Sequence, residues 1–193
     1  TVIYVNGILT TETQTKNDQK RLEQIFTDRT GRTDINFTTG YNQSHFAGAG
    51  DLVETASQIL NAPISNYDRD TILLQIYPEV TTRKILLVGH SQGTFYTNEI
   101  YDYLIAHGEP KEAIGVYNIA TPAGSVSGGG PYLTSQNDKV INLVRSLAPA
   151  AQQPLPANIV IPPASADPLG HSFGDVYLAN DSARIVSDAE GSL

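Results

Sequence analysis

A serine in a glycine-flanked turn is the residue of this chain whose surroundings most favour chemistry. Ser91 lies in Gly89-His90-Ser91-Gln92-Gly93, directly after the apolar run 84–88 and directly before a helical pattern over 94–107. A Gly-x-Ser-x-Gly run between a strand and a helix is typical of a sharp, strained turn that exposes the serine hydroxyl above the sheet edge. The first amides of the following helix favour negative charge there. The pattern predicts that Ser91 is a nucleophile; the alternative is an ordinary strand-to-helix turn whose glycines only allow close packing.

A serine hydroxyl needs a base to remove its proton, and histidine suits that task near neutral pH. Of the four histidines, His171 follows the last expected strand, where a base that comes after the serine and the acid in the chain would lie. We therefore expect His171 to be the base. His45, in a polar loop, is the alternative. His107 ends a helix, where a cation is favoured by the helix dipole, and His90 is expected to point away from its neighbour on so tight a turn.

The base in turn needs a carboxylate that fixes its tautomer and steadies the imidazolium. Asp138 follows a short expected strand in Ser135-Gln136-Asn137-Asp138-Lys139-Val140, at the same edge of the sheet as Ser91. Aspartate is also a favoured helix N-cap, and Asp138 opens a predicted helix, so the two roles can coexist. Asp167, in the loop of the histidine, and Asp175, on the helix after it, are the alternatives for the acid.

Two backbone amides are expected to hold the oxyanion that develops during attack on a carbonyl. One is the amide of Gln92, directly after the nucleophile, and the other is the amide of Ile8, in the loop after the opening strand. Asn6, Gly7 and His90 are expected to border the bound substrate. A plain strand-ending turn is the competing interpretation of the segment 6–8.

The composition excludes several classes of protein. With 193 residues, 40% of them hydrophobic, the chain suits one domain over 1–193 with a single sizeable core. A formal net charge of −8 makes nucleic acid an unsuitable partner, and no apolar run approaches the about 20 residues that cross a bilayer. Without cysteine there can be no disulfide, thiolate metal site or cysteine nucleophile. We expect no metal and no cofactor, because the histidines are few and scattered and no acidic run has calcium-loop spacing. The chain carries no methionine, so its first residue is not expected to be the translation start.

Strands and helices alternate along the whole chain, and this order predicts an α/β fold with a mostly parallel sheet covered by helices on both faces. Ligands in such sheets bind at the carboxyl ends of the strands, where Ser91 lies. The link 121–130 is short for a parallel crossover, so either it is an abbreviated loop or the strand after it is misassigned. Strands are expected at 1–5, 34–40, 84–88, 113–119, 132–135 and 158–161, and helices at 11–29, 51–60, 71–80, 94–107, 138–147 and 173–186.

These motifs, in this order, resemble the α/β-hydrolase superfamily. Val2-Ile3-Tyr4-Val5-Asn6-Gly7 resembles its oxyanion strand and loop, and the Ser91 motif resembles its nucleophile turn. The segment 135–140 is similar to its acid turn, Gly170-His171-Ser172, with Tyr177 behind it, to its histidine loop, and 117–122 to the strand and loop after the nucleophile helix of many lipases. Where many lipases carry His-Gly at the oxyanion loop, this chain has Asn6-Gly7. Its size and its Ser-Gln-Gly turn are cutinase-like, but it lacks the cysteines for cutinase disulfides.

The resemblance implies a minimal α/β-hydrolase fold without a large cap, because 121–130 is too short for one, and hence an open site with 41–50 as a small flap. It implies a serine ester hydrolase, of carboxylesterase or lipase type, that works through an acyl-enzyme on Ser91 and prefers small-molecule or lipid esters with short or medium acyl chains. A thioesterase, phospholipase or acyltransferase would use the same triad. A slowly turning binding or receptor module on the same fold is the alternative from another class.

Overall fold

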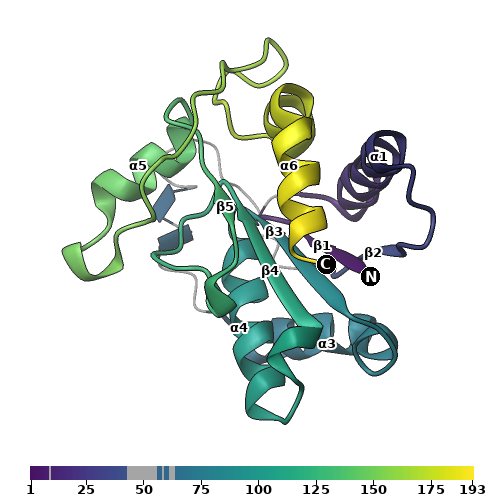
Figure 1. The fold of residues 1–193 in the computed structure, drawn as a ribbon. Coiled ribbons are helices and arrows are strands. Elements are labelled where there is room, and N and C mark those ends of the chain that lie inside the picture. The colour runs from purple at the N-terminus through teal and green to yellow at the C-terminus, as the bar shows by residue number, and fades with distance from the viewer. Residues whose placement is uncertain (9, 43–55, 58, 61–63) are drawn as a thin grey trace.

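Five parallel strands form the centre of the fold, in the order β2-β1-β3-β4-β5 (Figure 1). The computed structural model describes residues 1–8, 10–42, 56–57, 59–60 and 64–193. The strands are β1 (Val2–Val5), β2 (Phe37–Thr39), β3 (Ile85–His90), β4 (Ile114–Ile119) and β5 (Tyr132–Leu133). Gly89 pairs with Val5 on one side and with Asn118 on the other, so the carboxyl ends of the three central strands meet at one edge.

The helices begin and end where capping residues predict. They are α1 (Glu12–Thr30), α3 (Asn66–Val80), α4 (Gly93–Ala106), α5 (Lys139–Leu147) and α6 (Ala179–Gly191). Thr11 and Gln14 form a reciprocal capping box at the start of α1, and Gly31, with φ 69°, ends it. Pro78 is tolerated in α3 because it lies in the last turn, where a proline removes little helical hydrogen bonding.

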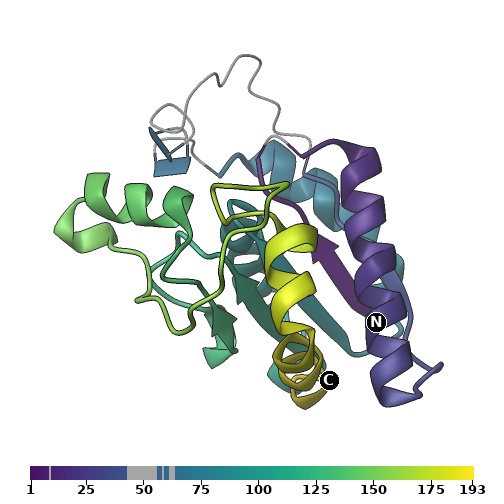
Figure 2. The same cartoon turned by 90° about the horizontal axis from the view of Figure 1, so that it is seen from above.

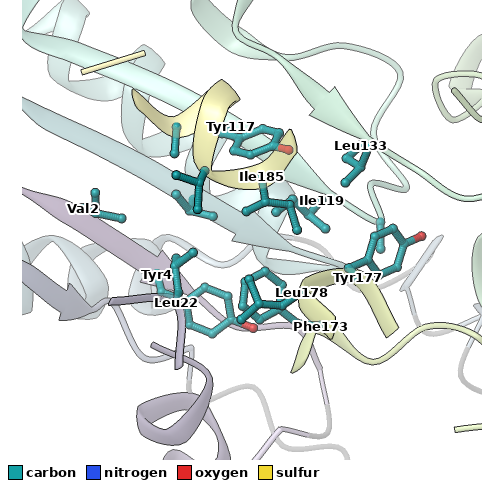
Figure 3. Close-up of a cluster of buried hydrophobic side chains, with 14 of the residues drawn as sticks. Val2, Tyr4, Leu22, Tyr117, Ile119, Leu133, Phe173, Tyr177, Leu178 and Ile185 are labelled. Atoms are coloured by element: carbon teal, nitrogen blue, oxygen red, sulfur yellow. The ribbon is translucent and has the colours of Figure 1, made fainter. Parts of the chain in front are cut away.

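Side chains alternate between the two faces of the sheet, and each face has its own helices (Figures 1 and 2). On one face, Val2, Tyr4, Leu86 and Val88 pack against α1, α6 and the segment before α6, and Figure 3 shows part of this cluster. On the other face, residues of the same strands that lie one position along pack against α3 and α4: Ile3, Val5, Ile85 and Leu87. The predicted fold class, a parallel sheet with helices on both faces, is confirmed.

The link between β4 and β5 settles one of the two alternatives. β5 runs parallel to β4, and the connection contains only a 3-10 turn, Ser127–Gly129. The strand prediction was therefore correct, although the strand is shorter, and the link is an abbreviated crossover.

The predicted strand 158–161 does not form. Ile159 makes an isolated parallel bridge to Ser135, and the backbone amide of Asn158 donates to the carbonyl of Thr134 at 2.9 Å. Pro154, Pro156, Pro162 and Pro163 surround this stretch, and proline lacks the N–H group that would extend the ladder.

Two other helix predictions need comment. The region expected to be a helix over 173–186 begins as a π-helical segment, Phe173–Leu178, and continues as α6. Of the helix predicted at 51–60, residues 56–57 and 59–60 are helical, and the remainder lies outside the described residues. None of the helices in the described ranges is both long and apolar enough to span a membrane.

Candidate active site

Ser91 occupies a strained turn between β3 and α4. Its backbone has φ 54°, a left-handed conformation that a residue with a Cβ rarely adopts. The turn is held from both sides, because the Ser91 amide donates to the carbonyl of Ile119 at 3.0 Å and Thr94 donates to the Ser91 carbonyl from both its amide and its hydroxyl. β4 ends in the same manner, with Ala120 at φ 49°. Strained residues of this kind cluster at functional sites, where the surrounding structure maintains them.

The glycines on either side of Ser91 are required by two different neighbours. A Cβ on Gly89 would lie 2.8 Å from the Cα of Thr94, so this glycine lets β3 and α4 approach each other. A Cβ on Gly93 would instead overlap the carbonyl oxygens of Val5 and Asn6. The second glycine therefore brings α4 against the loop after β1, which carries the predicted oxyanion amide.

The structure brings Ser91, His171 and Asp138 into one chain of hydrogen bonds. Nε2 of His171 lies 2.8 Å from Oγ of Ser91, and Nδ1 of His171 lies 2.8 Å from Oδ2 of Asp138. An ionised carboxylate only accepts, so Nδ1 carries the proton and Nε2 is free to accept the serine proton. The three residues lie at the carboxyl ends of β3, β5 and the stretch 158–161, as in a nucleophile–base–acid arrangement.

Asp138 is fully buried, and its carboxylate is satisfied at both oxygens. Oδ1 accepts from the amide of Ile141 at 3.0 Å, which makes Asp138 the N-cap of α5. Oδ2 accepts from the hydroxyl of Tyr177 at 2.8 Å as well as from His171. Tyr177 in turn accepts from the amide of Ser135 at 3.0 Å. Asp138 thus caps a helix and orients the imidazole, as the sequence allowed, while Tyr177 fixes the direction of its carboxylate.

The backbone of His171 is held at both ends. Its amide donates to Oδ2 of Asp167 at 2.7 Å, and its carbonyl lies 2.8 Å from Nε2 of His90. Burial, and next the neighbouring His171, lower the pKa of His90 to about 3, so the ring is neutral and donates its Nε2–H to that carbonyl. The structure therefore gives His90 a different use from the expected contact with substrate: its buried ring supports the histidine loop.

The surroundings of His171 favour its charged form. Burial acts to lower its pKa, but the carboxylates of Asp138 and, more weakly, Asp167 act in the opposite direction, and the net effect raises the pKa above its ordinary value of 6.5. The proton acceptor of the arrangement is thus a stronger base than a free histidine.

This shift predicts the pH dependence of the reaction. Only neutral His171 can accept the serine proton, so kcat/KM for an ester should rise with pH through an apparent pKa above 6.5. Stability changes in the opposite sense: the contribution of protonated His171 is fully present below pH 6.5 and is lost as pH rises through the raised pKa. Initial rates and thermal unfolding measured over the same buffers test both signs. A rate limb at or below 6.5 would contradict the assignment.

The loop after β1 lies directly against the nucleophile. A Cβ on Gly7 would come within 2.7 Å of the Cβ of Ser91, so only glycine permits this approach. The amides of Ile8 and Gln92 flank this contact along the chain, and neither donates a hydrogen bond to another residue in the described part of the protein. Two unused amides beside a serine hydroxyl are what an oxyanion requires, so Ile8 and Gln92 stay the predicted donors.

Asn6 and Asn42 tie together the loops that carry these amides. Oδ1 of Asn6 accepts from the amide of Asn42, and its Nδ2 donates to the carbonyls of Gly7 and Asn42. The side chain of Asn42 donates to Oε1 of Gln92 at 3.2 Å. Because Asn6 is fully buried and used in this way, it shapes the loop instead of facing the expected substrate. Sequence reasoning missed Asn42, whose only signal was an amide side chain shortly after the carboxyl end of β2.

The other candidates are placed differently. Asp167 accepts from the amides of Leu169, His171 and Ser172, so it forms the histidine loop. Asp175 pairs with Arg21 at 3.4 Å on the surface, and the ring of His107 stacks on Tyr103 at the end of α4. His45, and 43–50 of the expected flap, lie outside the described residues. Within the described ranges, no group of three or more histidine or acidic side chains could hold a metal ion.

A small apolar cluster adjoins the site from two directions. Ile8, next to Gly7, and Val140 and Val144, on the helix that Asp138 caps, pack with Ala56 and Ile59. Ser91 itself is only 2% exposed. The expectation of an open site considered only 121–130, which indeed holds no cap; the apolar cover comes from residues 56–59 instead.

The comparisons with known proteins are sparse. No family model and no curated protein matches the chain. Among solved structures, the chain is similar to a cutinase-like protein from Cryptococcus sp., with 17% sequence identity and a TM-score of 0.35. The similar region covers 65% of this chain and 56% of that protein, a little over half its length. The interpretation of the site therefore rests on its own geometry.

Proposed function

We propose that this chain is a serine ester hydrolase with a minimal α/β-hydrolase fold. One observation carries the proposal: the unbroken path from the Ser91 hydroxyl through His171 to the buried carboxylate of Asp138, with 2.8 Å at each step. A serine hydroxyl is weakly nucleophilic by itself, and a base oriented by a third group is the arrangement that activates it. A structural role for the serine would need neither a histidine at Nε2 nor a carboxylate behind that histidine.

In the acylation step, Oγ of Ser91 attacks the carbonyl carbon of the ester while Nε2 of His171 takes the hydroxyl proton. The new imidazolium donates from Nδ1 to Asp138, which stays ionised because its other contacts are also donors. The oxyanion of the tetrahedral intermediate lies toward the amides of Gln92 and Ile8. When the intermediate collapses, the alcohol leaves with the proton from Nε2.

Deacylation repeats these events with water. Nε2 takes a proton from a water molecule as that molecule attacks the acyl-enzyme carbonyl, and the proton then returns to Oγ of Ser91 as the acid is released. Alcohols are better leaving groups than amines at this step, which favours esters over amides as substrates.

Covalent labelling tests the proposal directly. A fluorophosphonate should label the protein with a stoichiometry of one, on a peptide that contains Ser91, and a p-nitrophenyl ester should release a burst of p-nitrophenol equal to the enzyme concentration. Heat-denatured protein, in which the hydrogen-bonded path is lost, is the control and should not be labelled. A folded protein that is neither labelled nor active on any ester would instead be a binding module, and the proposal would fail.

A further inference from the structure

A groove with a volume of about 540 Å³ lies beside the first turn of α4. Its walls include Leu60, Ile64, Phe95 and Pro122, and Ala151 lies at its exposed side. The volume falls within the range of clefts that hold small ligands, which is roughly 300–1,000 Å³. None of the described residues that line it is charged, so it suits an uncharged, apolar ligand.

The inner end of this groove is held at the nucleophile. Phe95 and Pro122 directly follow Thr94 and Thr121, whose hydroxyls are hydrogen-bonded to each other at 2.9 Å. The hydroxyl of Thr94 also reaches the carbonyl of Ser91 at 2.7 Å. Two walls of the groove are thereby fixed within about one helical turn of the reacting serine.

An apolar surface leads from the predicted oxyanion loop to the groove. Ile59 lines the groove and also belongs to the buried cluster that contains Ile8 and Val140. Phe95 packs against the same cluster. A chain bound to Ser91 could therefore follow apolar side chains from the carbonyl to the groove without crossing a charged group.

The side on which the groove lies decides which half of the ester it fits. His171 is followed by Phe173 and Tyr177, which pack on the face of the sheet covered by α1 and α6. The groove borders α4, which covers the opposite face. The leaving alcohol must take its proton from Nε2 of His171 and hence lies toward that residue, which leaves the side of α4 for the acyl chain.

We propose that this groove binds the acyl chain of the substrate and makes the protein selective for unbranched, uncharged acyl groups of medium length over acetyl. The inference rests on the proposed ester hydrolysis. Each methylene that the groove removes from water should raise kcat/KM by about fourfold, as its burial is worth about 0.8 kcal/mol. Octanoyl esters should therefore be hydrolysed more efficiently than acetyl esters with the same leaving group.

The test fills the groove from its exposed side. Ala151→Trp should lower kcat/KM for p-nitrophenyl octanoate at least tenfold and leave that for p-nitrophenyl acetate within about twofold, because several methylenes lose their binding surface. Ala150→Trp, the same change in the same exposed turn but at a residue that does not line the groove, is the matched control and should alter neither. Ser125→Trp fills the groove from another exposed residue and should repeat the effect if the first variant does not fold.

The possible results separate the two proposals. Loss of octanoate selectivity in Ala151→Trp alone supports the acyl groove. Equal loss for both esters, or no loss in either groove variant, overturns it while ester hydrolysis stands. If octyl acetate, with its long alcohol, is the substrate that suffers, the groove holds the alcohol and the inference is wrong. A wild-type protein without ester hydrolysis or Ser91 labelling would overturn both proposals.

Discussion

Replacing Ser91 with alanine should abolish ester hydrolysis while leaving the fold intact. The change removes the atom that forms the acyl-enzyme, and His171 is then left with a proton-accepting nitrogen and no hydroxyl beside it. Loss of a triad nucleophile lowers kcat by about 10⁵- to 10⁶-fold, and what remains comes from substrate binding and oxyanion stabilisation. Initial rates with p-nitrophenyl butyrate at a pH above the rate limb, together with fluorophosphonate labelling, measure the effect.

Thermal unfolding should barely respond to the same change. Alanine retains the Cβ and the strained φ of 54°, and the turn is held by backbone groups and by Thr94, none of which the substitution removes. Ser146→Ala, at an exposed serine on α5, is the control and should keep full activity. If Ser91→Ala retains most of the activity in a preparation that fluorophosphonate no longer labels, the nucleophile lies elsewhere.

Much of this site could be predicted from the sequence because few geometric rules decide it. Parallel strands place their carboxyl ends at one edge, so a serine, an aspartate and a histidine that each follow a different strand must meet there. The positions of Ser91, Asp138 and His171 in the chain were enough to expect their proximity, and the structure shows it. Their roles in catalysis remain predictions until turnover is measured.

What could not be predicted depends on side-chain packing and on the register of short segments. The π-helical segment Phe173–Leu178 places Tyr177 where its hydroxyl meets Asp138, and no periodicity in the sequence distinguishes this winding from an α-helix. Asn6 and His90 were expected near the substrate because of their neighbours in the chain. Each instead satisfies a buried backbone group, which matters more for a buried polar side chain than sequence proximity to a site.

The stretch 158–161 shows a different limit. Its apolar residues predict a strand, yet prolines on both sides restrict it to a single bridge with Ser135. That bridge is still enough to bring the chain back to the edge of the sheet, from which the histidine loop begins. Sequence patterns therefore located the segment correctly and overestimated its hydrogen bonding.

Replacing Asp138 with asparagine should lower kcat by about 10⁴-fold, because it reverses the tautomer of the base. The amide of Ile141 is a fixed donor, so the asparagine must place its carbonyl oxygen there and turn its NH₂ group toward His171. Nδ1 then has to accept, the ring proton moves to Nε2, and Nε2 can no longer take the proton of Ser91. Tyr177, whose hydroxyl can accept as well as donate, adapts to the change, so the protein should still fold.

The same variant should move the pH dependence, which a purely structural defect would not do. Without the carboxylate, its main source of upward shift, the pKa of His171 should fall, and the rate limb should move to lower pH. Asp175→Asn is the matched control, since this exposed carboxylate contacts only the surface residue Arg21 among the ion pairs of the described chain, and its rate should be unchanged. Near-normal activity in Asp138→Asn combined with severe loss in Asp167→Asn would transfer the acid role to Asp167. The three hydrogen bonds from backbone amides to Asp167 argue against that outcome, because they occupy the carboxylate within its own loop.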